Sequence, residues 1–277
     1  MSRNSNRTGT PKVPRPAPVP DDNNFSFVTP TEFVELPSRG QFYDENHPLH
    51  DSDVVEIRHM TAKEEDILTS EALLKSGTAL NRLLQSVLVD RNIYPESLLI
   101  GDKNAILIAI RQTGFGDLYT TTLNCSACGK QNDKDFSLDA KEITESILPE
   151  DVSLLDNGNF LIHDTDYDLK LEIKLLTGSD EARITKTLDS RKKLKKNVGT
   201  VTTMLENIIV AANDIRDAAA IRQVTQAMPV ALSRKVRSIY DTVMPNIGIY
   251  DDFECDFCSH AERLEVPITI HFFWPEL

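Results

Sequence analysis

The chain has four cysteines, and they form two pairs with two residues between the members of each. The first pair lies in the segment NCSACGK and the second in ECDFCSH, with residues 129–254 between them. A structural zinc site needs four ligands in a tetrahedron, and a tight CxxC turn delivers two sulfurs to one ion. The pattern therefore predicts a four-thiolate metal site with the ligands Cys125, Cys128, Cys255 and Cys258.

The segments around both pairs have the same character. Each approaches its first cysteine as an extended stretch with an apolar residue two positions before it, Leu123 or Phe253, and each continues into a second β-prone stretch. Two such turns facing one another form a zinc ribbon, in which backbone amides after the first cysteine donate to its sulfur. Ribbons often separate their pairs by about 15–20 residues. The longer insertion here is tolerated because loop-closure cost grows only logarithmically with length.

Three alternatives compete with a structural zinc site: a redox dithiol, four unrelated thiols and a catalytic zinc. A redox CxxC usually stands beside a βαβ pattern, and neither pair begins a helix. A catalytic zinc keeps one position open for water and seldom uses four thiolates. His260 could replace a ligand, but four cysteines already fill the coordination sphere, so we expect it to be exposed. The prediction is about one structural zinc ion per chain, with iron as the alternative metal.

Composition limits the partners. With 277 residues and a formal net charge of −13, the chain is unsuited to broad binding of nucleic acid or anionic membranes. No apolar run approaches the ~18 residues of a membrane span, and the N-terminus lacks the apolar core of a signal peptide. A cytoplasmic setting follows, where thiols stay reduced and paired CxxC motifs favour metal over disulfides. The basic run at Arg191, Lys192, Lys193, Lys195 and Lys196 is interpreted as a solvated helix face, with a docking patch for an acidic partner as the alternative.

The predicted fold class is α+β, with helical subdomains, small antiparallel sheets and a split zinc-ribbon-like four-cysteine site. Residues 1–27 are rich in proline and predict a disordered arm. Residues 28–117 predict a strand followed by a helical subdomain. Residues 118–277 predict a ribbon-like β region, formed by 118–178 and 247–277, with a helical insertion at 179–246.

Local signals place several elements. Thr61 followed by Glu64 predicts a capping box, and the helix it starts is expected to run to Gly77. Asp102 is expected to cap a further buried helix, in the segment DKNAILIAIRQTG. The segment VTTMLENIIVAAN is expected to be helical, and the C-terminal EVPITIHFFWPEL is expected to be β.

Motifs for catalysis are missing from the sequence. It has no phosphate-binding loop, no dinucleotide glycine fingerprint, no GxSxG elbow and no HExxH. The segment HDTDYD lacks the glycine and the terminal glutamate of a calcium loop, so we interpret it as a polar turn. The chain is therefore predicted not to be an enzyme.

Three blocks upstream of the second cysteine pair carry a family resemblance: FVELPSRGQFY, VEIRHMTAKEEDIL and LLIGDKNAILIAIRQTGFGDLYTTTLNCSAC. They resemble the baseplate hub and hub-assembly proteins of tailed phages similar to the T-even group. The resemblance implies a non-enzymatic structural or assembly protein of a contractile-tail baseplate. Its implied partners are other hub, spike or tail-tube proteins, and its implied locations are the virion and, during assembly, the host cytoplasm.

The rival interpretation is a zinc-ribbon adaptor or regulator in transcription or nucleic-acid handling. Such ribbons usually carry basic and aromatic residues on their strands. Here acidic residues predominate around both cysteine pairs, which disfavours phosphate contact: Asp133, Asp135, Asp251, Asp252, Glu254 and Asp256 against Lys130, Lys134 and Arg263.

Overall fold

The protein is described by a computed structural model that covers residues 29–194, 199–266, 268 and 270–273. The predicted arm at residues 1–27 lies outside the described residues, as do Lys195 and Lys196 of the basic run. Eight helices and small antiparallel sheets within the described ranges confirm the α+β class. The helices are α1 (Ala62–Thr69), α2 (Glu71–Ser76), α3 (Ala79–Val87), α4 (Ile100–Phe115), α5 (Gly178–Lys193), α6 (Thr200–Ile208), α7 (Ala218–Ala227) and α8 (Val230–Val243).

The strands form four antiparallel sheets, ordered β1-β2, β11-β10-β5, β3-β4 and β6-β7-β8-β9. β10 is the longest of them and pairs with β5 along its first half and with β11 along its second. The strands are β1 (Thr31–Glu35), β2 (Val54–Arg58), β3 (Leu118–Asn124), β4 (Gln131–Ser137), β5 (Lys141–Thr144), β6 (Val152–Leu154), β7 (Phe160–Asp164), β8 (Leu169–Ile173), β9 (Ile209–Ala212), β10 (Asn246–Glu254) and β11 (Ala261–Glu265).

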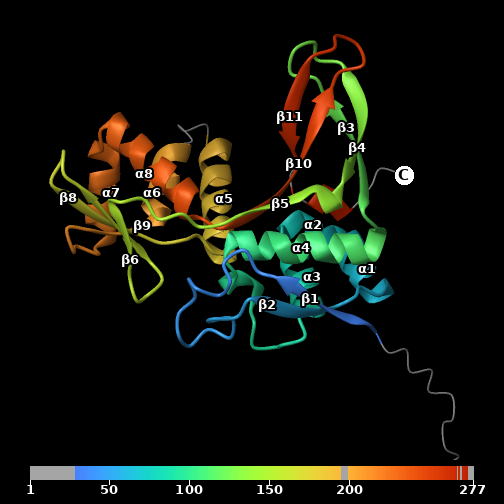
Figure 1. Cartoon of the computed structure of the whole chain (residues 1–277), viewed down its shortest axis with the longest axis horizontal. Helices are drawn as coiled ribbons and strands as arrows, with labels where there is room; N and C mark the ends of the chain where they lie inside the picture. Colours follow the sequence, from blue (N-terminus) through green and yellow to red (C-terminus); the bar gives the residue numbers. More distant parts are fainter. Residues whose placement is uncertain (1–28, 195–198, 267, 269, 274–277) are drawn as a thin grey trace, which may run out of the picture.

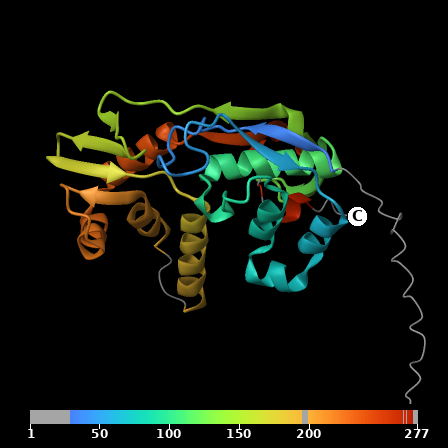
Figure 2. The same ribbon diagram turned by 90° about the horizontal axis from the view of Figure 1, so that it is seen from below.

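Helix α4 lies at the centre of the molecule (Figure 1). Helices α1–α3 cover one side of it, and strands β1 and β10 lie on the opposite side (Figure 2). The hairpins β3–β4 and β10–β11 project together from this layer, while the β6–β9 sheet and α5–α8 lie beyond one end of α4 (Figure 1). One hydrophobic core connects α4, α8 and the strands packed on them. The division into segments predicted from the sequence stays a prediction.

The LPSRGQFY segment folds around a buried carboxylate of α4. Asp102 accepts hydrogen bonds from the Ser38 N–H at 3.0 Å, the Ser38 hydroxyl at 2.6 Å and the Tyr43 hydroxyl at 2.8 Å. The Tyr43 oxygen also accepts from the N–H of Leu99, at 3.0 Å. Burial raises the pKa of Asp102, although the hydrogen bonds from Ser38 and Tyr43 lower it. The prediction that Asp102 caps α4 was wrong: Leu99 is the N-cap, because the carboxylate turns to the loop instead of to its own helix.

Two glycines allow close backbone approaches here. Gly40 has φ +70°, and a Cβ at this position would lie 2.3 Å from the Ser52 nitrogen. A Cβ at Gly101 would lie 2.2 Å from the carbonyl oxygen of Pro245, which precedes β10. Any side chain at Gly101 would therefore push α4 away from β10.

A second buried carboxylate organises α1. The predicted capping box of Thr61 and Glu64 is confirmed, with Glu64 accepting from the Thr61 N–H at 2.9 Å and hydroxyl at 2.7 Å. Glu64 also binds both terminal nitrogens of Arg58, at 2.5 and 3.0 Å, and the hydroxyl of Ser86, at 2.5 Å. Its burial raises the pKa, but these donors lower it more, and the net pKa falls well below the ordinary value.

Three other predicted elements differ from the structure. The helix expected to run to Gly77 is interrupted at Ser70, which ends α1 and caps α2. The expected helix VTTMLENIIVAAN ends at Ile208, and Ile209–Ala212 form β9, because β-branched residues there pair with the edge of β8. Within the segment predicted to be β at the C-terminus, Ile270–Phe273 form a 3₁₀ turn instead, and Pro267, Thr269 and residues 274–277 lie outside the described residues.

This C-terminal turn is held by the buried guanidinium of Arg111 in α4. Arg111 donates to the carbonyls of Phe272 at 3.0 Å, Gly116 at 3.2 Å and Leu118 at 3.1 Å. Phe272 and Phe273 are fully buried, which explains why the segment curls onto the core instead of extending as a strand. Of the helices described, none combines the length and apolar character needed to traverse a bilayer.

Replacing Tyr43 with phenylalanine should destabilise the protein by about 1–3 kcal/mol, because the Leu99 N–H loses its acceptor and Asp102 loses a donor. Urea denaturation measures the change. Tyr94→Phe is the matched control, since Tyr94 is 61% exposed and should tolerate the change. Equal stability of Y43F and wild type would contradict a structural role of the Asp102 network.

Glu64→Gln should cost about 2–4 kcal/mol near neutral pH, because Arg58 loses its buried counter-charge. The folded pKa of Glu64 lies below its unfolded value near 4.3, so its stabilisation is present above about pH 4.3 and is lost as the pH falls towards the folded pKa. The gap between wild type and E64Q should therefore narrow in acid. Glu65→Gln, an exposed change in the same helical turn, should have little effect.

Candidate metal centre

Two hairpins far apart in the sequence present the cysteines. β3 pairs with β4 up to Asn124↔Gln131, and the turn that joins them holds Cys125 and Cys128. β10 pairs with β11 up to Glu254↔Ala261, and its turn holds Cys255 and Cys258. The hairpins stand side by side, so that their tips meet (Figure 1).

Both cysteine turns have the same backbone geometry. The first cysteine donates its N–H to the carbonyl five residues on, at 3.0 Å in the first turn and 2.9 Å in the second. Its carbonyl accepts from the N–H four residues on, at 2.9 Å in both. That fourth residue has a left-handed backbone in each turn, with φ +71° at Gly129 and φ +53° at Ser259. The two cysteine turns are therefore two copies of the same backbone motif.

All four predicted sulfurs converge. The Sγ atoms of Cys125 and Cys258 lie 3.7 Å apart, as do those of Cys128 and Cys255, and the four lie within 4.8 Å of one another. A disulfide requires about 2.05 Å. A tetrahedron with metal–sulfur bonds of about 2.3 Å has sulfur–sulfur edges of about 3.8 Å. The donor set and its spacing therefore fit a four-thiolate ion site, and ligation by these residues stays a prediction.

The surroundings favour the thiolate at Cys255 and disfavour it at Cys258. Burial raises the pKa of Cys255, but the N–H groups of Phe257 and Cys258 and the neighbouring thiols donate to its sulfur, so that the pKa falls to about 6. The N–H of His260 lowers the pKa of Cys258, whereas burial and the adjacent sulfurs raise it, with a net pKa of about 12. Four sulfurs this close cannot all ionise without a cation among them.

A small apolar core lies beneath the sulfurs. Cys125, Cys255 and Phe253 are buried together, and Leu123 and Leu264 pack against them. Leu123 and Phe253 are the apolar residues found two positions before each cysteine pair. The buried members of this cluster lie apart from the main core, with Leu123 packed against both, so the tip of the paired hairpins has few apolar contacts of its own.

Asn132 is a residue of the site that the sequence did not reveal. Its side chain is 4% exposed, accepts from the N–H of Asp256 at 2.9 Å and donates to the carbonyl of Lys130 at 3.0 Å. It thereby joins one cysteine turn to the other. Nothing in the local sequence distinguishes this asparagine, because its partner lies 124 positions away.

His260 lies beside the sulfurs without joining them. Its Nε2 contacts the Ser126 hydroxyl at 3.1 Å and the Glu262 carboxylate at 3.8 Å, and its side chain is 38% exposed. His260 is therefore half-buried between these side chains, whereas the sequence predicts an exposed residue. Within the described ranges, the four cysteines are the one group of three or more His, Cys, Asp or Glu side chains placed to hold a metal.

In the polar segment HDTDYD, His163 and Asp164 end β7 and residues 165–168 form the turn to β8. Asp164 accepts from Lys235 at 3.0 Å and from the N–H of Tyr167 at 3.1 Å. These contacts agree with its interpretation as a polar turn.

The fold and the site define a class: an α+β protein in which two distant hairpins meet at a split four-cysteine site. The family model of the T4 bacteriophage base plate protein matches residues 29–274. The chain therefore belongs to this baseplate family, which agrees with the resemblance seen in the sequence. Membership implies contact with other phage tail components. No curated protein and no solved structure matched the chain.

Elemental analysis of a reduced, chelator-free preparation should find about one zinc ion per chain. Cys255→Ser should lose most of the metal and speed amide exchange in β10 and β11, because structural zinc contributes folding free energy directly. His260→Ala is the matched control and should keep the metal. A folded wild-type protein without metal, or metal loss in H260A equal to that in C255S, would contradict the four-cysteine assignment.

Proposed function

We propose that the protein is a non-enzymatic structural or assembly component of the hub region of a contractile-tail baseplate. The observation that carries this proposal is the family match over residues 29–274. Its partners would be other hub, spike or tail-tube proteins, met in the host cytoplasm during assembly and in the virion afterwards. The net charge of −13 favours protein partners over nucleic acid.

In this role, the four-cysteine site would hold one structural zinc ion. The hairpins β3–β4 and β10–β11 project from the α4 layer, and an ion at their tips would fix one against the other (Figure 1). The acidic side chains of these hairpins would then form a rigid surface, including Asp133, Asp252, Glu254 and Asp256. Such a surface suits a basic patch on a neighbouring tail protein.

The low content of catalytic features supports a structural role. Asp102 and Glu64 are buried carboxylates, and each is enclosed by donors that serve the fold. The hollow at the paired hairpins is lined mainly by charged side chains and lacks the apolar walls of a substrate pocket. The two buried carboxylates thus stabilise the fold, and the charged hollow suits contact with another protein.

A tagged copy of the protein should co-purify with hub, spike or tail-tube proteins from infected-cell lysate. Proteomics of purified phage particles then separates two forms of the proposal: presence in particles supports a permanent subunit, and presence only in intermediates supports an assembly factor. C255S, compared with H260A, tests whether the four-cysteine site is needed for co-purification. Recovery without any tail protein, together with absence from particles, would overturn the proposal.

A further inference from the structure

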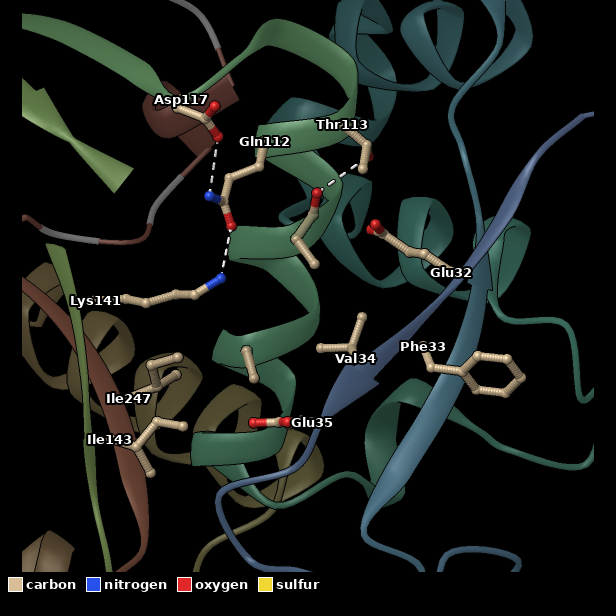
Figure 3. A pocket seen from close by; sticks show the side chains of 12 residues that line it. Glu32, Phe33, Val34, Glu35, Gln112, Thr113, Asp117, Lys141, Ile143 and Ile247 are labelled. Atoms are coloured by element: carbon tan, nitrogen blue, oxygen red, sulfur yellow. Dashed lines mark hydrogen bonds between the residues drawn. The ribbon is translucent and has the colours of Figure 1, made fainter. Parts of the chain in front are cut away.

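An open groove of 480 Å³ runs along the outer side of α4 (Figure 3). Its floor is a stripe of mostly small side chains, and one wall is β1. The other wall is the face of the β5–β10 pair that carries Lys141, Ile143 and Ile247 (Figure 3). The floor residues recur at helical spacing: Ala105, Ala109, Gln112 and Thr113.

The β1 wall offers an unused strand edge. β1 pairs only with β2 among the described residues. The Leu36 N–H donates to Asp53 and the Pro30 carbonyl accepts from His59, so the even-numbered residues of this stretch direct their backbone groups towards β2. Thr31, Phe33 and Glu35 therefore direct their N–H and C=O groups away from β2, towards the groove.

The charged groups that line the groove are mostly acidic. The Oε1 atom of Glu32 is buried and has no hydrogen-bond partner among the described residues. Its carboxylate points towards the α4 floor near Thr113 (Figure 3). Glu32, Glu35 and Asp117 line the groove against the single cation Lys141, so an occupant with positive charge is favoured.

The N-terminal arm of this chain matches that chemistry. Residues 1–20 contain four cations and no acidic residue: Arg3, Arg7, Lys12 and Arg15. Between residues 13 and 20, every even position is proline and every odd position keeps its N–H. In an extended strand, alternate residues direct their backbone groups to the same edge. This segment can therefore pair along one edge only, and the prolines close the other edge to further strands.

The arm also begins beside the groove. Thr29 and Pro30, which precede β1, line an adjoining hollow that includes Thr113 of the groove floor. The segment DDNN at 21–24 consists of turn-forming residues. A chain reversal there would direct residues 13–19 back along β1 in the antiparallel sense.

We propose that residues 13–19 of the arm add to the free edge of β1 as an antiparallel strand of the same chain. The odd positions pair with the backbone of Thr31, Phe33 and Glu35. Directly opposed residues share a face, so the prolines lie on the Val34 side and pack on the α4 floor. This docking is independent of the hub role and of zinc.

Amide hydrogen exchange of the full-length chain tests the pairing. The outward amides of β1, at Phe33 and Glu35, should be protected, and deleting residues 1–20 should speed their exchange about tenfold or more. Ala17→Pro removes an N–H from the pairing edge and should have a similar effect. Pro16→Ala is the matched control: it restores an N–H only on the outer edge and should preserve the protection. Both substitutions lie in the N-terminal arm and leave the sequence of the folded part unchanged, so misfolding does not account for a difference between the two variants.

Two results would overturn the proposal. One is exchange at Phe33 and Glu35 that is the same with and without residues 1–20. The other is protection that disappears on dilution together with a dimer, which would mean that the arm of one copy pairs with β1 of another. Protection that is independent of concentration, lost in A17P and kept in P16A, supports pairing within one chain.

Discussion

Hydrogen bonds to the buried carboxylate of Asp102 hold the central helix α4 to the LPSRGQFY loop. A carboxylate this far from water is tolerated only when donors surround it. The LPSRGQFY loop supplies these donors through Ser38 and Tyr43, and Tyr43 also satisfies the N–H at the start of α4. The loop and the helix therefore fix each other. Because α4 is the central helix, the position of β1, β10 and the helices α1–α3 follows from this contact.

Strand β10 connects that centre to the cysteines. Its first half approaches α4 so closely that only glycine fits at position 101, and its second half leads directly to Cys255. A strand paired on both halves, with β5 and then β11, is stiff along its length. The position of the second cysteine turn is therefore set by the packing of the opposite end of β10 on α4. The same strand supplies Ile247 to the wall of the groove beside β1.

Local signals in the sequence predicted some of these features and missed others for a physical reason. Each CxxC spacing and the Thr61–Glu64 capping box involve residues within one turn, so the sequence predicts both features. The sequence predicts that Asp102 caps α4, but its donors lie about 60 positions upstream, in the LPSRGQFY loop. β9 forms because it pairs with the edge of β8, and the C-terminal 3₁₀ turn is held by the buried Arg111. The role of Asn132 depends on its contact with the N–H of Asp256. These misses are contacts between distant segments, which periodicity does not report, whereas the break between α1 and α2 at Ser70 is local.

The separation of the two cysteine turns has a consequence for biosynthesis. Cys128 and Cys255 lie 127 positions apart. At about 5–20 residues per second, a ribosome needs roughly 6–25 seconds to add that length. The first turn must therefore leave the ribosome and wait as a two-thiol half-site while the β6–β9 sheet and its helices are made. An ion held by all four sulfurs can be enclosed only when the chain is nearly complete, so metal uptake would mark the end of synthesis of each copy.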